Sequence, residues 1–317
     1  MSIAALQVYG TFILYLNFDS IEEKMDYLNS IKKYILSLIN YETFKSGNAC
    51  MIILREYFEL YSQFDELYFE GLKLFEKFTE IIKQREFNSL KAFLFFFAYQ
   101  TKRYSSPAVK ELLNQEFITA CITEKEEYVD FCMYCFFKGL YLIEKKNYFM
   151  ASYLYCAAIE MGLNNHSENI FVFNNFSIQM LKTLCFLKHL SDFNVTEYLF
   201  KKKLGQFKYY ADKMEYDKID VCFDYLMKQK IDLEYFYNFL KMNKDFDKNN
   251  KLIGLRNEAE EMLIFRKIKD IIKMYKKIKL TKLSEYTDID FNILMKIIKK
   301  KCLEGEINVK YDEEKCN

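Results

Sequence analysis

The chain has 317 residues, only 8 glycines and 1 proline, and a formal net charge of +1. So few turn-forming residues argue against a sheet-rich fold, which needs many tight turns. The balanced charge argues against a protein that binds nucleic acid through its overall positive charge, and the length is enough to bury one large core or two modest ones.

The cysteines and the apolar runs bear on the cellular compartment. Nine cysteines, an odd number, are spread along the chain, which fits reduced thiols in a cytoplasmic or nuclear protein. The longest uninterrupted apolar run, residues 92–99, is shorter than the ~20 residues that a bilayer-spanning helix needs. Residues 3–16 are apolar but have neither a basic flank nor a cleavage site. We therefore expect no membrane association.

The first eighty residues show apolar side chains at helical spacing. Ser20 followed by Glu23 is the spacing of a capping box, so a helix is predicted to begin there. Two more helical runs are predicted over residues 49–82. Gly47 and Gly71 are each predicted to fall between helical runs.

Residues 89–100 are almost wholly apolar, which predicts a helix that is buried on all sides. A polar turn over residues 102–106 is predicted to end it. Pro107 fits the first turn of the next helix, because a residue there needs no backbone N–H.

The most informative repeat lies over residues 131–165. Gly139, Ala151, Tyr155 and Ala158 stand where a tetratricopeptide helix pair carries small residues and an aromatic one. Small residues let the two helices approach closely, and the aromatic ring is expected to fill the space between neighbouring pairs. One such pair cannot bury its apolar face alone, so we expect neighbouring helices to stack on it.

The last sixth of the chain shows the order of a winged helix. A helical run over 264–275 and a second over 291–302 are followed by an alternating tail at 307–311. We therefore predict an all-α protein, a right-handed tetratricopeptide-like helical-repeat solenoid that ends in a winged helix with a minimal β-sheet. A polar patch at 243–251 precedes this module.

Few residues suggest catalysis. His166 and His189 do not form a metal-binding motif, and a surface or packing role is favoured for His166. Cys132 and Cys135 form one C-x-x-C among aromatic residues, which favours core cysteines over a redox motif. We therefore predict no enzyme activity and no catalytic, cofactor-binding or metal-binding residues.

The winged-helix region is locally basic. From Arg266 to Lys301 it holds 12 Lys or Arg against 4 Asp or Glu. Such an excess could bind nucleic acid through phosphate contacts, or it could simply solvate the outer face of a helix. The candidate contacts for the nucleic-acid alternative are Lys296, Lys299, Lys300 and Lys301. The second helix has no arginine to read guanine, so nucleic acid is the less favoured partner.

The other use of such a module is as an adhesive edge. A short strand at Lys279 and Leu280 would pair with the tail and leave an open edge that a partner strand could join. The predicted interface residues are Lys279, Leu280, Ile307, Asn308, Val309 and Tyr311.

Several short motifs carry a resemblance to a known family. An aromatic run ending at Gly139 is followed by Lys146–Asn147–Tyr148, and Glu304–Gly305–Glu306–Ile307 closes the last predicted helix. Together with a helical-repeat region that continues into a winged helix, these motifs resemble the PCI domain of the proteasome lid, the signalosome and a translation-initiation complex. Within that group the chain is most similar to the family of subunit 3 of the constitutive photomorphogenesis-9 signalosome, and the proteasome-lid PCI subunit is a close second.

The resemblance implies a division into 1–125, N-terminal helical repeats, 126–258, the helical part of the PCI domain, and 259–317, its winged-helix part. It implies a non-catalytic scaffold subunit in the cytoplasm and nucleus, with other PCI-domain subunits as partners and cullin-RING ligases as indirect ones. In the signalosome a different, zinc-bearing subunit removes the ubiquitin-like protein NEDD8 from cullins. The alternatives are a proteasome-lid subunit and a PCI protein that binds RNA or DNA.

Overall fold

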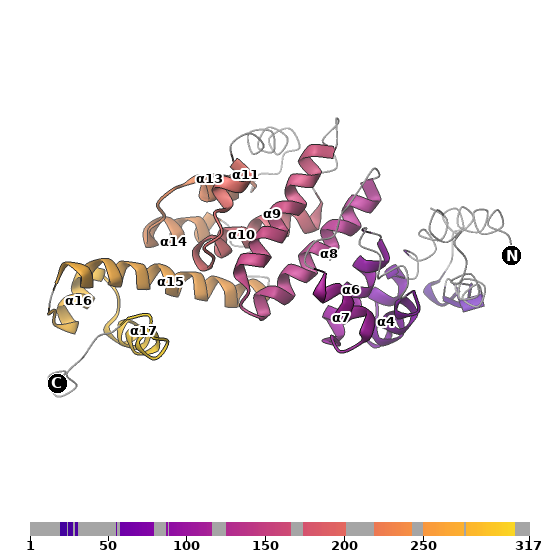
Figure 1. The fold of residues 1–317 in the computed structure, drawn as a ribbon, viewed down its shortest axis with the longest axis horizontal. Helices are drawn as coiled ribbons and strands as arrows, with labels where there is room; N and C mark the ends of the chain where they lie inside the picture. The colour runs from indigo at the N-terminus through magenta and orange to yellow at the C-terminus, as the bar shows by residue number, and fades with distance from the viewer. Residues whose placement is uncertain are drawn as a thin grey trace. The chain divides into compact units, whose positions relative to one another are not determined.

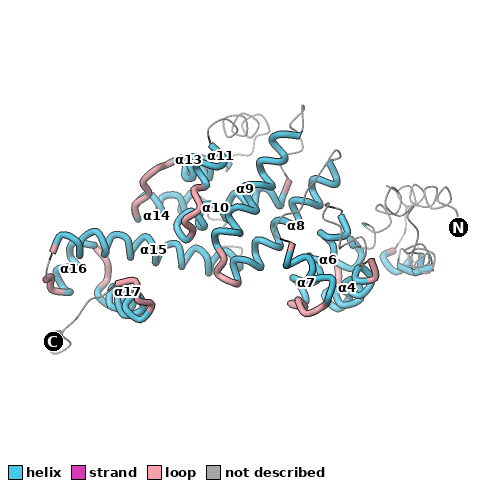
Figure 2. Tube along the Cα trace, in the orientation of Figure 1, coloured by secondary structure: helices cyan, strands magenta, loops and turns pink. Residues whose placement is uncertain are grey.

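The structure is a computed structural model in which the described residues are mostly helical and include no strand (Figures 1 and 2). This confirms the all-α class. Among the described residues, no helix has both the length and the apolar character needed to cross a bilayer. The residues that the structure describes are 20–23, 25–27, 29–30, 55, 58–78, 87, 89–115, 125–165, 174–200, 219–242, 250–275 and 277–307.

The chain divides into two compact units, Met1–Gln179 and Met180–Asn317. These bounds differ from the predicted divisions after residues 125 and 258. Residue 258 lies inside α15 (Asn250–Met274), a continuous helix. The predicted polar patch at 243–251 overlaps only the first turn of that helix, and its other residues lie outside the described ones.

In the first unit, the described helices α4, α7 and α8 each pack on the central apolar helix α6, and α9 packs on α8. Residues Ser89 to Tyr99 of α6 are all buried, as their apolar sequence predicts. Phe97 stacks on Phe75 of α4 with ring centroids 5.6 Å apart, and Phe96 meets Phe137 of α8 edge to face at 4.9 Å. The described elements of this unit are η2 (Asp65–Leu67), α4 (Tyr68–Glu76), α6 (Ser89–Thr101), α7 (Pro107–Asn114), α8 (Lys125–Glu144) and α9 (Tyr148–Asn165), and α10 (Asn175–Leu190) begins in it.

Two glycines let α8 and α9 approach closely (Figure 1). A Cβ on Gly139 would lie 2.1 Å from the ring of Tyr155, and a Cβ on Gly162 would lie 2.1 Å from the hydroxyl of Tyr128. Each tyrosine hydroxyl then donates to a carbonyl of the opposite helix, Tyr155 to Phe136 at 3.1 Å and Tyr128 to Ala158 at 3.2 Å. The predicted close approach at Gly139 is confirmed, but the ring of Tyr155 packs within the pair and not between neighbouring pairs as expected. Gly162 with Tyr128 forms a second, reciprocal contact that was not predicted from the sequence.

The local signals for two helix starts are confirmed. Ser106 caps α7 by accepting a hydrogen bond from the Val109 N–H at 3.3 Å, and Pro107 occupies its first turn. Ser20 accepts from the Glu23 N–H at 3.1 Å, as the capping-box spacing predicts.

The prediction that Gly71 falls between helices was wrong, because Gly71 lies inside α4. The ring of Phe97 packs against it, and a Cβ there would lie 2.9 Å from that ring. The glycine therefore serves close packing instead of a turn. Gly47 lies outside the described residues.

The second unit contains the end of α10 and six further described helices. Its first part has an aromatic core in which Tyr225 and Phe239 lie with ring centroids 4.0 Å apart. The described helices after α10 are α11 (Val195–Phe200), α13 (Ile219–Met227), α14 (Leu233–Met242), α15, α16 (Leu280–Thr287) and α17 (Phe291–Leu303).

Candidate functional site in the C-terminal helices

Helices α15, α16 and α17 surround one apolar core, which fixes their arrangement. Ile268 of α15, Leu283 of α16 and Leu294 and Ile298 of α17 are all at most 1% exposed. Asp290 begins α17 by accepting hydrogen bonds from the N–H groups of its first turn. The predicted second helical run over 291–302 is thereby confirmed.

The predicted adhesive edge is only partly within the described residues. Lys279 has an extended backbone and is exposed, but Leu280 begins α16 instead of belonging to a strand. The reason is local, since the Lys279 carbonyl accepts the first helical hydrogen bond from Leu283 at 2.9 Å. Leu280 and Ile307 both pack against the three-helix core, so their side chains stabilise the module itself. The remaining members of the set, Asn308, Val309 and Tyr311, lie outside the described residues.

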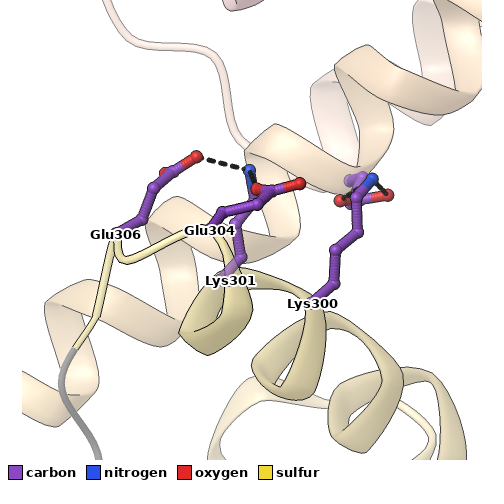
Figure 3. Close-up of polar contacts among 5 residues, drawn as sticks. Lys300, Lys301, Glu304 and Glu306 are labelled. Atoms are coloured by element: carbon purple, nitrogen blue, oxygen red, sulfur yellow. Dashed lines mark hydrogen bonds and ion pairs between the residues drawn. The ribbon is translucent and has the colours of Figure 1, made fainter.

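One of the four candidate nucleic-acid lysines is buried in ion pairs. Lys301 is 5% exposed, and its ammonium group lies 2.8 Å from Glu304 and 2.7 Å from Glu306 (Figure 3). Burial alone would lower the pKa of Lys301, but the hydrogen bonds to these two carboxylates outweigh it and raise the pKa. The hydrogen bond from Lys301 likewise lowers the pKa of Glu304. Lys301 therefore has no free charge to offer a phosphate.

A second candidate lysine is also paired. Lys300 reaches Glu261 on α15 at 2.7 Å, so at this end of α17 two lysines face three carboxylates (Figure 3). Lys296 and Lys299 remain exposed on the outer side of α17. The structure thus brings the four predicted lysines onto one helix, but it does not present them together as a phosphate-binding row.

A different part of the module does present exposed aromatic and basic groups. Tyr275, just after α15, stacks on Tyr286 of α16 with ring centroids 5.9 Å apart and an interplanar angle of 18°. A hydrogen bond between the two side chains raises the pKa of Tyr275. This stretch lies within the predicted basic region, where Tyr275 was expected only as a member of the apolar helical run over 264–275 and no role was predicted for Tyr286. The four lysines that lie between the two tyrosines in the sequence were the available signal.

The one described histidine is a packing residue. His189 is 3% exposed, and its Nε2 lies 2.6 Å from the hydroxyl of Tyr225. Burial lowers the pKa of His189 to about 3, and the positive charges of Arg266 and Lys188 add to this effect. It is therefore neutral at pH 7 and poorly suited to accept a proton. His166 lies outside the described residues.

The C-x-x-C cysteines are buried in the core of the first unit, as predicted. Burial raises the pKa of Cys132 to about 11 and raises that of Cys135 as well, so both remain thiols at neutral pH. A thiol that stays protonated is a weak nucleophile and a weak metal ligand. Among the described residues, no group of three or more His, Cys, Asp or Glu side chains is placed to hold a metal ion.

No protein-family model matches the chain, and no curated protein matches it significantly.

Proposed function

We propose that the chain is a non-catalytic scaffold subunit, a PCI-type protein in which a right-handed helical-repeat solenoid continues into a winged helix. The observation that carries the proposal is the α8–α9 pair, where each helix places a tyrosine ring over a glycine of the other. Packing of this kind is typical of tetratricopeptide-like repeats, whose stacked pairs form extended binding surfaces. It supports the repeat interpretation on which the scaffold proposal rests.

The C-terminal helices support the second half of the proposal. Helices α15, α16 and α17 follow the order of the helices in a winged helix, and they share a compact core. The tail that would form the wing, 308–311, lies outside the described residues. In this proposal the module serves as a docking element for neighbouring subunits.

The buried chemistry of the chain is also consistent with a scaffold. Cys132, Cys135 and His189 belong to the types that most often act as nucleophiles and bases. Here each is buried, and the direction of its pKa shift keeps it neutral. These side chains stabilise cores, which is the role that a scaffold requires of them.

The assembly that we propose first is the signalosome, with other PCI-domain subunits as direct partners and cullin-RING ligases as indirect ones. The catalytic removal of NEDD8 would then belong to another subunit, and this chain would contribute shape and contacts in the cytoplasm and nucleus. The proteasome lid is the alternative within the same class. Both proposals rest on the sequence resemblance.

Affinity purification of the tagged chain from its native source, followed by mass spectrometry, tests the proposal. We expect other PCI-domain subunits to be recovered with it, and the identity of the companion proteins separates the signalosome from the lid. Recovery of the chain as a lone monomer would contradict the scaffold role.

The structure changes which variants are suitable for locating the interface. Leu280 and Ile307 help to hold the core together, so replacing them would disturb the fold as well as any interface. Ile293 and Leu303 are 50% and 90% exposed on α17. Ile293→Asp and Leu303→Asp should therefore reduce recovery of the partners while leaving the circular dichroism spectrum unchanged. Phe149→Asp, at a side chain 52% exposed on α9, is the comparison variant outside the module, and a loss of partners there would place the interface on the helical repeats instead.

A further inference from the structure

The junction between α15 and α16 carries two aromatic rings that are exposed although they stack on each other. Tyr275 and Tyr286 are 43% and 49% exposed, and their centroids lie 5.9 Å apart. The two rings lie nearly parallel, at an interplanar angle of 18°. The exposed remainder is a flat apolar surface that is already held in place, so another flat ring could stack on it at a small entropic cost.

Three lysines lie next to this pair in the chain. Lys277, Lys279 and Lys282 are exposed, and none of them forms an ion pair with a described residue. Lys282 stands four residues before Tyr286 on α16, a spacing that places both on one face of the helix. Glu285 is the one carboxylate within α16, so the lysines leave an excess of positive charge. This contrasts with α17, where Lys300 and Lys301 are neutralised by partners.

We propose that the α15–α16 junction, formed by the Tyr275–Tyr286 pair and by Lys277, Lys279 and Lys282, binds single-stranded nucleic acid. A fixed aromatic platform beside unpaired lysines matches the two chemical features of a single strand, its exposed base faces and its phosphates. In a duplex the base faces are occupied by neighbouring bases, and an acidic peptide offers charge without flat rings. The proposal goes beyond the scaffold role and does not depend on it.

Fluorescence anisotropy of the purified full-length chain tests the proposal directly. The probes are labelled oligouridine and oligothymidine of about 16 nucleotides, near the upper end of known site sizes for single-strand folds. We expect both probes to bind, and a preference between them assigns the site to RNA or to DNA. Tyr286→Ala should weaken binding by about 5- to 150-fold, the range that loss of one stacking contact produces. Tyr286→Phe keeps the ring and should stay within about twofold of the wild-type affinity, as stacking requires.

The lysines are tested with a matched pair of variants. Replacing Lys277, Lys279 and Lys282 by Ala should reduce the slope of log affinity against log salt by about 2, because each phosphate contact of a single strand contributes about 0.7. Lys296→Ala with Lys299→Ala removes exposed lysines of α17 and should leave binding unchanged. Circular dichroism establishes that every variant is folded.

Three results would overturn the proposal. The first is that neither probe binds near physiological salt. The second is that binding is lost when the α17 lysines are replaced and is kept when the junction lysines are replaced. The third is that a duplex or polyglutamate displaces the probe as well as an unlabelled single strand does. The last result would show that charge alone, without stacking, accounts for the interaction.

Discussion

At the scale of single residues, Gly139 is the position where the α8–α9 pair can be tested most sharply. A Cβ there would lie 2.1 Å from the ring of Tyr155, so Gly139→Ala forces one helix away from the other. We expect the free energy of unfolding to fall by about 1–3 kcal/mol, which is typical of overpacking.

Gly254 provides the matched control for this substitution. It also lies inside a helix, α15, but a Cβ there would meet nothing within 4 Å. Gly254→Ala should raise the free energy of unfolding by about 0.5–1 kcal/mol, because alanine favours the helix and nothing has to move. Thermal unfolding followed by circular dichroism measures both variants. Equal effects at the two glycines would contradict the packing argument.

His189 makes a testable contribution to the dependence of stability on pH. Its pKa is about 3 in the folded chain against an ordinary value of 6.5, so between these values the unfolded chain binds a proton that the folded chain does not. His189 therefore does not reduce the free energy of unfolding above about pH 6.5. Below that value it lowers the free energy of unfolding by about 1.4 kcal/mol per pH unit, as the pH falls toward 3.

Urea unfolding at pH 7 and pH 5 of the wild type and of His189→Gln measures this contribution. The wild type should lose about 2 kcal/mol more than the variant between the two pH values, since the carboxylates contribute equally to both. An equal loss of unfolding free energy in the two proteins between pH 7 and pH 5 would show that His189 takes up its proton in the folded state as well.

At the scale of elements, several helices are followed by a residue other than glycine at the position with positive φ. Lys102 and Asp288 directly follow α6 and α16, Lys146 is the second residue after α8, and all three have positive φ. After α8, for example, the Asn147 N–H donates to Leu142 and the Lys146 N–H to Ile143, the paired hydrogen bonds of a Schellman motif. With only 8 glycines available, the left-handed position after a helix is filled by lysine or aspartate at a cost in backbone strain.

Lys146→Gly should relieve this strain. The left-handed conformation costs an L-residue about 1–2 kcal/mol, which glycine would avoid. The greater freedom of glycine in the unfolded chain offsets about 0.4–1 kcal/mol of this gain. We therefore expect a net gain of about 0.5–1 kcal/mol, measured as a higher midpoint of thermal unfolding. Gly305→Ala, at the corresponding position after α17 with φ of 74°, is the opposite change and should destabilise the chain.

The sequence predicted elements best where the signal was local. Three such signals each determine the helix in which they lie. They are the apolar run of α6, the Pro107 start of α7 and the apolar run of α17. Gly71 was misplaced because its role is set by Phe97, on another helix. The pairing of Lys301 also escaped prediction, because it depends on how Glu304 and Glu306 turn back over the end of α17.

At the scale of the whole molecule, the part of the chain that the structure describes includes five buried cysteines, which are distributed over the two compact units. All five are 0% exposed, so each thiol reports the opening of the structure around it. Burial raises the pKa of Cys132, Cys135, Cys156 and Cys185, which slows alkylation further. Of these five, Cys132, Cys135 and Cys156 belong to the first unit, and Cys185 and Cys222 belong to the second.

Pulsed alkylation with iodoacetamide at increasing urea, mapped by mass spectrometry, tests whether each unit unfolds as a whole. Because a compact domain of this size unfolds cooperatively, Cys132, Cys135 and Cys156 should become reactive over one urea range, and Cys185 and Cys222 should also share one range. Cys302 is only partly buried and should react at lower urea than either group. If Cys132 reacts at a clearly lower urea concentration than Cys156, then α8 and α9 open separately. The reciprocal tyrosine–glycine contacts would then not hold them together as one unit.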